Sequence, residues 1–120
     1  MQVKNREIYN AREPLGELIT KEMPVRIGYQ LMILADKFEA QFKITEPIRK
    51  QLITRYGEPD PTNPAAFFVN PASEKHSKFT EEVGELMDIE IDIDWQPLKI
   101  PDTLQITPLS LRALKRFIRV

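Results

Sequence analysis

The chain has 120 residues, a formal net charge of −1, 42% apolar and 29% charged residues, and no cysteine. This is one domain's worth of residues, with enough large apolar side chains for most of the chain to fold. The lack of cysteine excludes disulfides, zinc–thiolate sites and thiol catalysis, and the small net charge argues against a protein that coats nucleic acid. No apolar run has the length of a membrane span, and the polar residues after Met1 are not typical of a signal peptide.

The first 57 residues are expected to form three helices. Apolar spacing predicts a helix over residues 6–21, with Asn5 as its N-cap and a kink or break at Pro14, because proline lacks an amide donor. Spacings of four and three predict a second helix over residues 25–42, and the pattern resumes over residues 46–56. The third helix is expected to bury Ile48 and Leu52, to be capped by Thr45, to carry Pro47 in its first turn, and to end at Gly57 in the left-handed conformation.

Residues 58–73 contain four prolines and are expected to be a loop. Within this loop, residues 66–69 are apolar and β-prone. Phe67 and Phe68 are expected to form a short strand or a plug against the core, because two adjacent phenylalanines need cover. The alternative is that the pair is exposed as an anchor for another protein, since aromatic side chains dominate protein interfaces.

The spacing of the apolar residues changes from helical to alternating in the second half of the chain. A helix is predicted over residues 74–87, and strict alternation over residues 88–95 then predicts a half-buried strand. The side chains expected on the inward face of this strand are Ile89, Ile91, Ile93 and Trp95. Thr107 and Pro108 mark the start of a last helix, which is expected to continue to Ile118.

These elements predict a mainly α fold within the α+β class, with about five helices and a small β element around residues 88–95. All 120 residues are expected to form a single domain. Its parts would be a helical part at 5–57, a Pro-rich loop at 58–73, and a helix–strand–helix part at 74–118.

Charge is distributed unevenly along the chain. Residues 1–57 carry ten Lys/Arg and seven Asp/Glu, residues 58–106 carry three and eleven, and residues 107–120 carry four and none. The segments therefore have formal charges of +3, −8 and +4, which sum to −1. Surfaces of opposite sign are expected, either paired within the molecule or facing a partner.

Glu90, Asp92 and Asp94 share the outer face of the predicted strand, about 7 Å apart by strand rise. We interpret them as a candidate partner-binding surface. The simplest alternative is a solvated face whose charges discourage edge-to-edge pairing. A metal-dependent enzyme is a weaker alternative, because a two-metal site needs further carboxylates and no second acidic motif accompanies these three.

Four cations are expected on one side of the last helix, at offsets of 3, 4 and 7, where they could grip phosphates. They are Arg112, Lys115, Arg116 and Arg119. The simpler interpretation is a solvated face or a favourable placement at a helix C-terminus, and internal pairing with the acidic strand is a further alternative. Nucleic acid is not favoured as a partner, because the acidic segment would repel phosphates unless it faced away, and aromatic stacking platforms are lacking.

The sequence contains no recognisable catalytic motif. The four glycines are too far apart to cradle a phosphate, no serine lies in a nucleophile motif, and the one histidine, His76, lies among polar residues. We therefore expect no enzymatic activity, no cofactor and no metal. The preferred function is protein–protein interaction, and the alternative is a nucleic-acid-binding accessory protein that uses the basic last helix. The expected partner is another protein; a homo-oligomer is left open and no membrane is involved.

Five segments carry a resemblance to known proteins: residues 3–8 (VKNREI), 23–27 (MPVRI), 49–58 (RKQLITRYGE), 79–95 and 97–100 (PLKI). In this order they resemble a family of small tailed-bacteriophage proteins of unknown function. The resemblance implies a viral or prophage origin and a location in the host cytoplasm or with the virion. It favours an accessory protein, such as an assembly factor or a binder of a host protein, and it implies no activity and no site residues.

Overall fold

The computed structural model describes residues 1–120 apart from the side chain of Pro64. Within them, the helices are α1 (Asn5–Leu18), α2 (Val25–Tyr56), α3 (Lys75–Met87) and α4 (Pro108–Leu114). The strands are β1 (Gln2–Lys4), β2 (Glu58–Asp60), β3 (Asn63–Phe68), β4 (Glu90–Asp92), β5 (Leu98–Lys99) and β6 (Ile118–Arg119), which pair into three two-stranded sheets. The mainly helical α+β class is confirmed, but the described residues form four helices instead of five.

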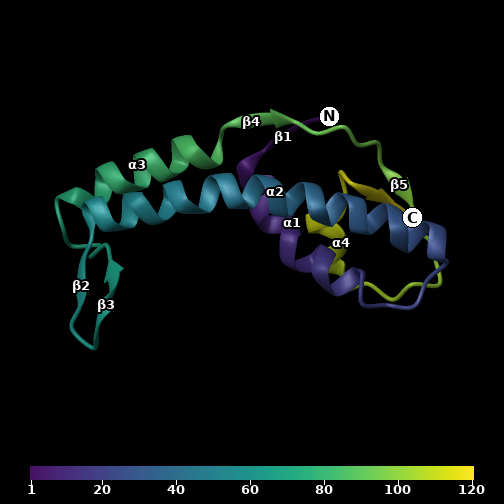
Figure 1. Ribbon diagram of the computed structural model, residues 1–120, viewed down its shortest axis with the longest axis horizontal. Coiled ribbons are helices and arrows are strands. Elements are labelled where there is room, and N and C mark those ends of the chain that lie inside the picture. Colours follow the sequence, from purple (N-terminus) through teal and green to yellow (C-terminus); the bar gives the residue numbers. More distant parts are fainter.

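The long helix α2 is the axis of the molecule (Figure 1). Its 32 residues, at a rise of about 1.5 Å each, have nearly the length of the longest molecular dimension, 50 Å. Helix α3 packs antiparallel against the C-terminal half of α2, whereas α1 packs against its N-terminal half and also contacts α4 (Figure 1). Helices α1 and α3 therefore both pack on α2, each along a different half of it.

The predicted second and third helices are one continuous helix because Thr45 does not act as a cap. Its side chain is buried, and its hydroxyl donates to the carbonyl of Gln41 at 3.0 Å, which is compatible with an unbroken helix. Pro47 lies inside α2 and removes only one backbone donor. In the same way α1 passes through Pro14 without the break that the sequence predicted.

Asn5 is the first residue of α1 and not its N-cap, which is Lys4. The Asn5 amide donates to the carbonyl of Leu86 at 2.9 Å, and its oxygen accepts from the side chain of Gln41 at 2.9 Å. Asn5 is only 2% exposed, so both bonds form away from water. This buried polar side chain therefore ties the start of α1 to α2 and to the end of α3.

Residues 58–68 of the Pro-rich segment form a hairpin where a loop was expected, and β3 includes most of the short strand expected within residues 66–69. Strands β2 and β3 pair antiparallel, with Glu58 opposite Phe68, and the hairpin projects from the end of α2 (Figure 1). Gly57 lies between α2 and the hairpin in an extended conformation, φ −96°, so the predicted left-handed stop is wrong. Glycine is needed there for space, because a Cβ would lie 2.3 Å from the carbonyl oxygen of Ile53 and 2.7 Å from that of Phe68.

The predicted strand 88–95 is shorter than expected but keeps its alternation. Strand β4 pairs antiparallel with β1, which places Ile91 opposite the fully buried Val3. Ile93 is buried and Trp95 is half-buried, as predicted. Ile89 is the exception: it precedes the strand and is 50% exposed.

The last helix starts as predicted and ends early. The hydroxyl of Thr107 accepts the amide of Ser110 at 3.2 Å, and Pro108 is the first helical residue. The helix ends at Leu114, and β6 then runs parallel to β5. The indole of Trp95 donates to the carbonyl of Phe117 at 2.9 Å, which holds the turn between α4 and β6 against the strand segment.

Two hydrophobic clusters lie along α2. The larger one surrounds its N-terminal half and includes Phe38, whose ring meets that of Phe117 edge to face at 5.0 Å. The smaller one lies between α2 and α3 and is centred on Leu52, Leu86 and Met87. None of the described helices has the length and apolar character needed to cross a membrane.

Candidate functional site

The three acidic residues predicted as a site are exposed, as their alternation implied. Glu90 and Asp92 belong to β4, and Asp94 follows it. The ammonium group of Met1 lies 3.4 Å from the carboxylate of Asp92. Residues 79–98, which run from α3 through β4, contain seven acidic and no basic residues.

This acidic segment borders an apolar groove of about 410 Å³ between α3 and the C-terminal half of α2. Its apolar lining consists of Ile48, Leu52, Leu86 and Ile89, and its charged lining consists of Arg55, Glu82 and Glu85. Ile48 is 42% exposed and Ile89 is 50% exposed, although the sequence pattern placed both inward. Both line the groove, Ile48 from α2 and Ile89 from the segment between α3 and β4.

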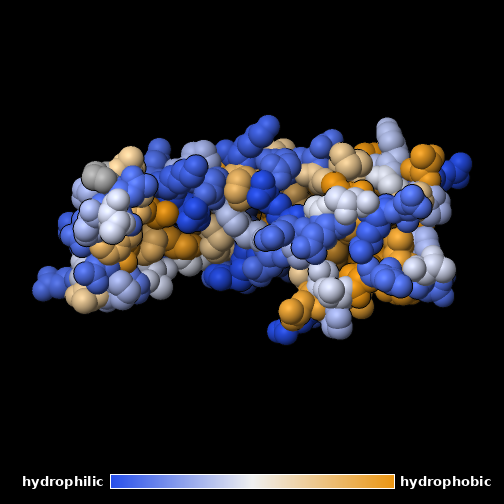
Figure 2. Space-filling model, turned by 90° about the horizontal axis from the view of Figure 1, so that it is seen from below, coloured by the Kyte–Doolittle hydropathy of each residue, from blue (hydrophilic) through white to orange (hydrophobic). Residues whose placement is uncertain are grey.

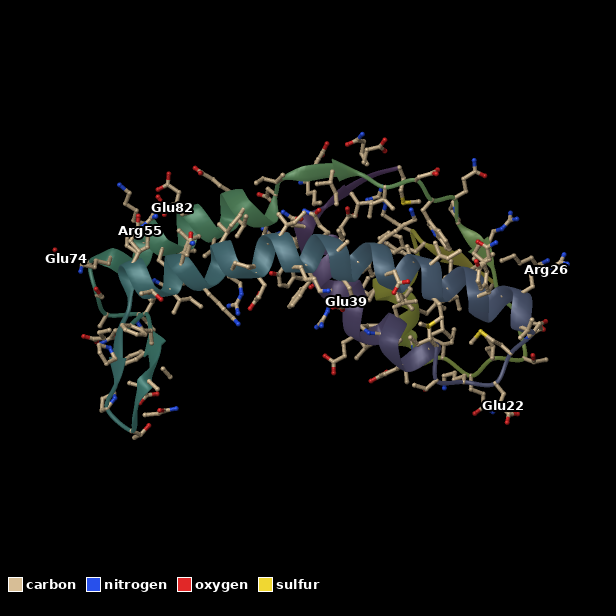
Figure 3. The ribbon with its side chains drawn as sticks, viewed as in Figure 1. Glu22, Arg26, Glu39, Arg55, Glu74 and Glu82 are labelled. Carbon is tan, nitrogen blue, oxygen red and sulfur yellow. The ribbon has the colours of Figure 1, made fainter. Side chains whose placement is uncertain are left out.

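The rim of the groove keeps an excess of negative charge. Arg55 and Glu82 point toward one another from α2 and α3, with a nitrogen–oxygen distance of 3.7 Å (Figure 3). Arg6 binds Asp88 at 3.0 Å. Within the described part of the chain, neither Glu85, which lines the groove, nor Glu90, which follows Ile89 in the chain but does not line the groove, has a basic partner within ion-pair distance. These two carboxylates are therefore available to a partner.

The four C-terminal cations do not form one helical face. Arg112 lies in α4, Lys115 is its C-cap, Arg116 is in the following turn, and Arg119 is in β6. The guanidinium of Arg116 pairs with Glu7 of α1 and donates to the carbonyl of Gln2 at 2.8 Å. This internal pairing joins α1 to the C-terminal segment, and the predicted alternative of pairing with the acidic strand is not observed among the described residues.

Phe67 and Phe68 lie in the hairpin, at the end of α2 that is distant from β4 (Figure 1). Phe67 is 42% exposed and Phe68 is half-buried, so the pair is a strand rather than a plug in the main core. The structure therefore does not bring the phenylalanines together with Glu90, Asp92 and Asp94. Apolar surface gathers toward both ends of the face shown in Figure 2, with hydrophilic surface between them.

The strongest pKa shifts occur in a structural network between α1 and α2. Hydrogen bonds from Arg49, 2.5 Å and 2.9 Å long, lower the pKa of Glu46 to about 2. Burial, together with its 2.7 Å hydrogen bond to Glu46, raises the pKa of Tyr9 to about 12. Because these groups satisfy one another, the shifts are explained by helix packing and need no catalytic role. Among the described residues, no three acidic or histidine side chains form a metal-binding group.

The Glu46 pairing predicts a specific loss of stability in acid. The pKa of Glu46 is lower in the folded chain than its ordinary value of 4.5, so its contribution is present above pH 4.5 and is lost as pH falls toward 2. Since Arg49 is partly exposed, we expect a loss of about 1–2 kcal/mol. Urea unfolding of the wild type and of Glu46→Gln at several pH values measures it. The stability difference between them should shrink between pH 5 and pH 2, and a constant difference would contradict the assignment.

Comparison with protein families, with curated proteins and with solved structures finds no match in any of the three. What the protein does must therefore be inferred from its own surfaces.

Proposed function

We propose that the protein is a non-enzymatic interaction protein that binds a basic, apolar segment of another protein in the groove between α2 and α3. The observation that carries this proposal is the exposure of Ile48 and Ile89 in one groove, beside Glu85, a carboxylate that lacks a basic partner among the described residues. Neither Ile48 nor Ile89 belongs to the buried cluster beneath the groove, which is formed by Leu52, Leu86 and Met87.

The two kinds of residue have separate roles in binding. Ile48 and Ile89 supply the apolar surface whose burial stabilises a complex, at roughly 25 cal/mol per Å². Glu85 and Glu90 supply a negative field that selects a basic partner and accelerates encounter with it. An amphipathic helix with cationic flanks fits both requirements, since a helix lays one apolar stripe into such a groove.

The resemblance to small tailed-bacteriophage proteins supports an accessory role in a phage, as an assembly factor or a binder of a host protein, in the host cytoplasm or with the virion. The nucleic-acid alternative loses support from the arrangement of the cations. Arg116 is engaged with Glu7, and Arg119 lies on a strand and not on the helix.

Charge selectivity can be measured with two matched amphipathic helical peptides, one of leucine and lysine and one of leucine and glutamate. We expect the lysine peptide to bind and the glutamate peptide to bind at least about tenfold more weakly, with the difference falling at high salt because exposed charges are screened. The double variant Glu85→Lys, Glu90→Lys should lose this preference. The matched control is Glu13→Lys, Glu22→Lys, which reverses two exposed acids elsewhere. Equal affinity of the wild type for both peptides would refute the proposed role of the rim.

A further inference from the structure

A second pocket, distant in the chain from the groove, lies between α1 and the C-terminal segment. It has a volume of about 350 Å³, within the usual range for small-molecule sites. Its lining consists of Glu7, Asn10, Leu109, Arg112, Ala113, Lys115, Arg116 and Phe117. The pocket thus combines an apolar part with three cations and a single carboxylate.

The charges of this pocket do not cancel. Glu7 is engaged by Arg116, whose guanidinium is also held by the carbonyl of Gln2. Arg112 and Lys115 are exposed and form no ion pair within the described part of the chain. About two positive charges therefore face the pocket uncompensated, beside an Arg116 that is already fixed in place.

The apolar part of the pocket combines exposed and buried side chains. Leu109 is 75% exposed, and Ala113 follows it one helical turn later. Phe117 is buried and forms part of the main core, so the lining on that side is rigid. An exposed leucine beside unpaired cations has no evident role in stability, because α4 buries Leu114 in the core instead.

We propose that this pocket binds a small organic anion, in which one carboxylate or phosphate group is joined to an apolar body. The anionic group would meet Arg112 and Lys115, and the apolar body would cover Leu109 and Ala113. A concave site of this size favours a small molecule over a nucleic-acid backbone, which would need cations spread along an extended face.

The probes are octanoate, octyl phosphate, octylammonium and inorganic phosphate, added to the full-length protein and followed by amide chemical shifts in NMR. Octanoate and octyl phosphate present the same chain with the two candidate anionic groups, and their relative affinities identify the preferred one. We expect saturable shifts centred on Leu109, Ala113 and Arg116 with at least one of these two anions. Octylammonium should leave these residues unshifted, and inorganic phosphate should bind more weakly than octyl phosphate.

The variant Arg112→Ala, Lys115→Ala should weaken binding by about tenfold or more, because it removes charge-assisted hydrogen bonds. Both side chains are exposed, so the fold should be retained. The matched control is Arg26→Ala, Lys43→Ala, which removes two exposed cations from α2. Equal binding of octylammonium, shifts centred elsewhere, or an unchanged affinity in the Arg112, Lys115 variant would overturn the proposal. Displacement of the anion by submicromolar duplex DNA would also overturn it, in favour of a nucleic-acid site.

Discussion

Replacing Phe38 with alanine is expected to lower the free energy of unfolding by about 3–5 kcal/mol. Phe38 is 1% exposed and belongs to the larger cluster, where its ring packs edge to face on Phe117. The substitution removes the contact between α2 and the C-terminal segment and leaves a cavity that the surrounding helices can fill only in part. Urea unfolding followed by circular dichroism measures the change.

The matched control for this variant is Phe42→Ala, one helical turn along α2. Phe42 is only half-buried and contacts Tyr9 at 5.1 Å between ring centroids. Its replacement should cost clearly less than that of Phe38. Equal losses for the two variants would mean that the cluster around the first half of α2 is not the main source of stability.

Replacing Ile93 with aspartate is the second change with a large expected effect, a loss of about 3–5 kcal/mol. Ile93 is 5% exposed, and its amide donates to the carbonyl of Met1 at 2.9 Å. An aspartate there would place a charged carboxylate among the apolar side chains of the larger cluster. Asp94→Ser should change stability by less than about 0.5 kcal/mol, because Asp94 is exposed.

Thermal and urea unfolding of these two variants test the alternation that the sequence predicted. If Ile93→Asp and Asp94→Ser had similar effects, the inward and outward faces of the segment after β4 would have been assigned wrongly. A folded Ile93→Asp protein with unchanged stability would lead to the same conclusion.

The elements with strong local signals could be predicted from the sequence. The alternation of residues 88–95 identified the inward face at Ile91, Ile93 and Trp95, because a strand has a period of two and one face meets the core, whereas Ile89 is exposed. The cap at Thr107 was equally clear, since a hydroxyl followed by Pro108 suits the start of a helix. In both cases the information is contained within a few neighbouring residues.

The errors arose where distant contacts decide the local structure. Thr45 resembles a cap in sequence, but Asn5 and Gln41 surround it in a buried polar cluster and α2 continues through it. Pro47, two residues later, also suggested the first turn of a new helix, but it lies inside α2. The hairpin at residues 58–68 was predicted only in part. The apolar residues 66–69 indicated a short strand, but the prolines before them suggested a loop, and the two strands depend on pairing with each other.

The candidate groove was only partly predictable. The exposure of Glu90 follows from alternation, but Ile48 and Ile89 lie on apolar patterns that suggest burial. Their exposure depends on how far α3 extends along α2, which is a tertiary property. The basic residues were placed on one helix because no local signal ends α4 at Leu114; the end is set by the pairing of β6 with β5.

The most direct test of the proposed interaction surface is the affinity of the leucine–lysine peptide for a protein with Ile48→Ser and Ile89→Ser, which removes apolar surface without adding charge, measured by isothermal titration calorimetry. Both side chains are at least 42% exposed, so circular dichroism and unfolding should remain close to those of the wild type. The control is Val25→Ser, Leu109→Ser, which changes two apolar side chains that are 90% and 75% exposed outside the groove. Binding in the groove predicts a loss of affinity of about a hundredfold in the groove variant, equivalent to roughly 2.7 kcal/mol, and wild-type affinity in the control. Equal affinity of the groove variant and the wild type would contradict it.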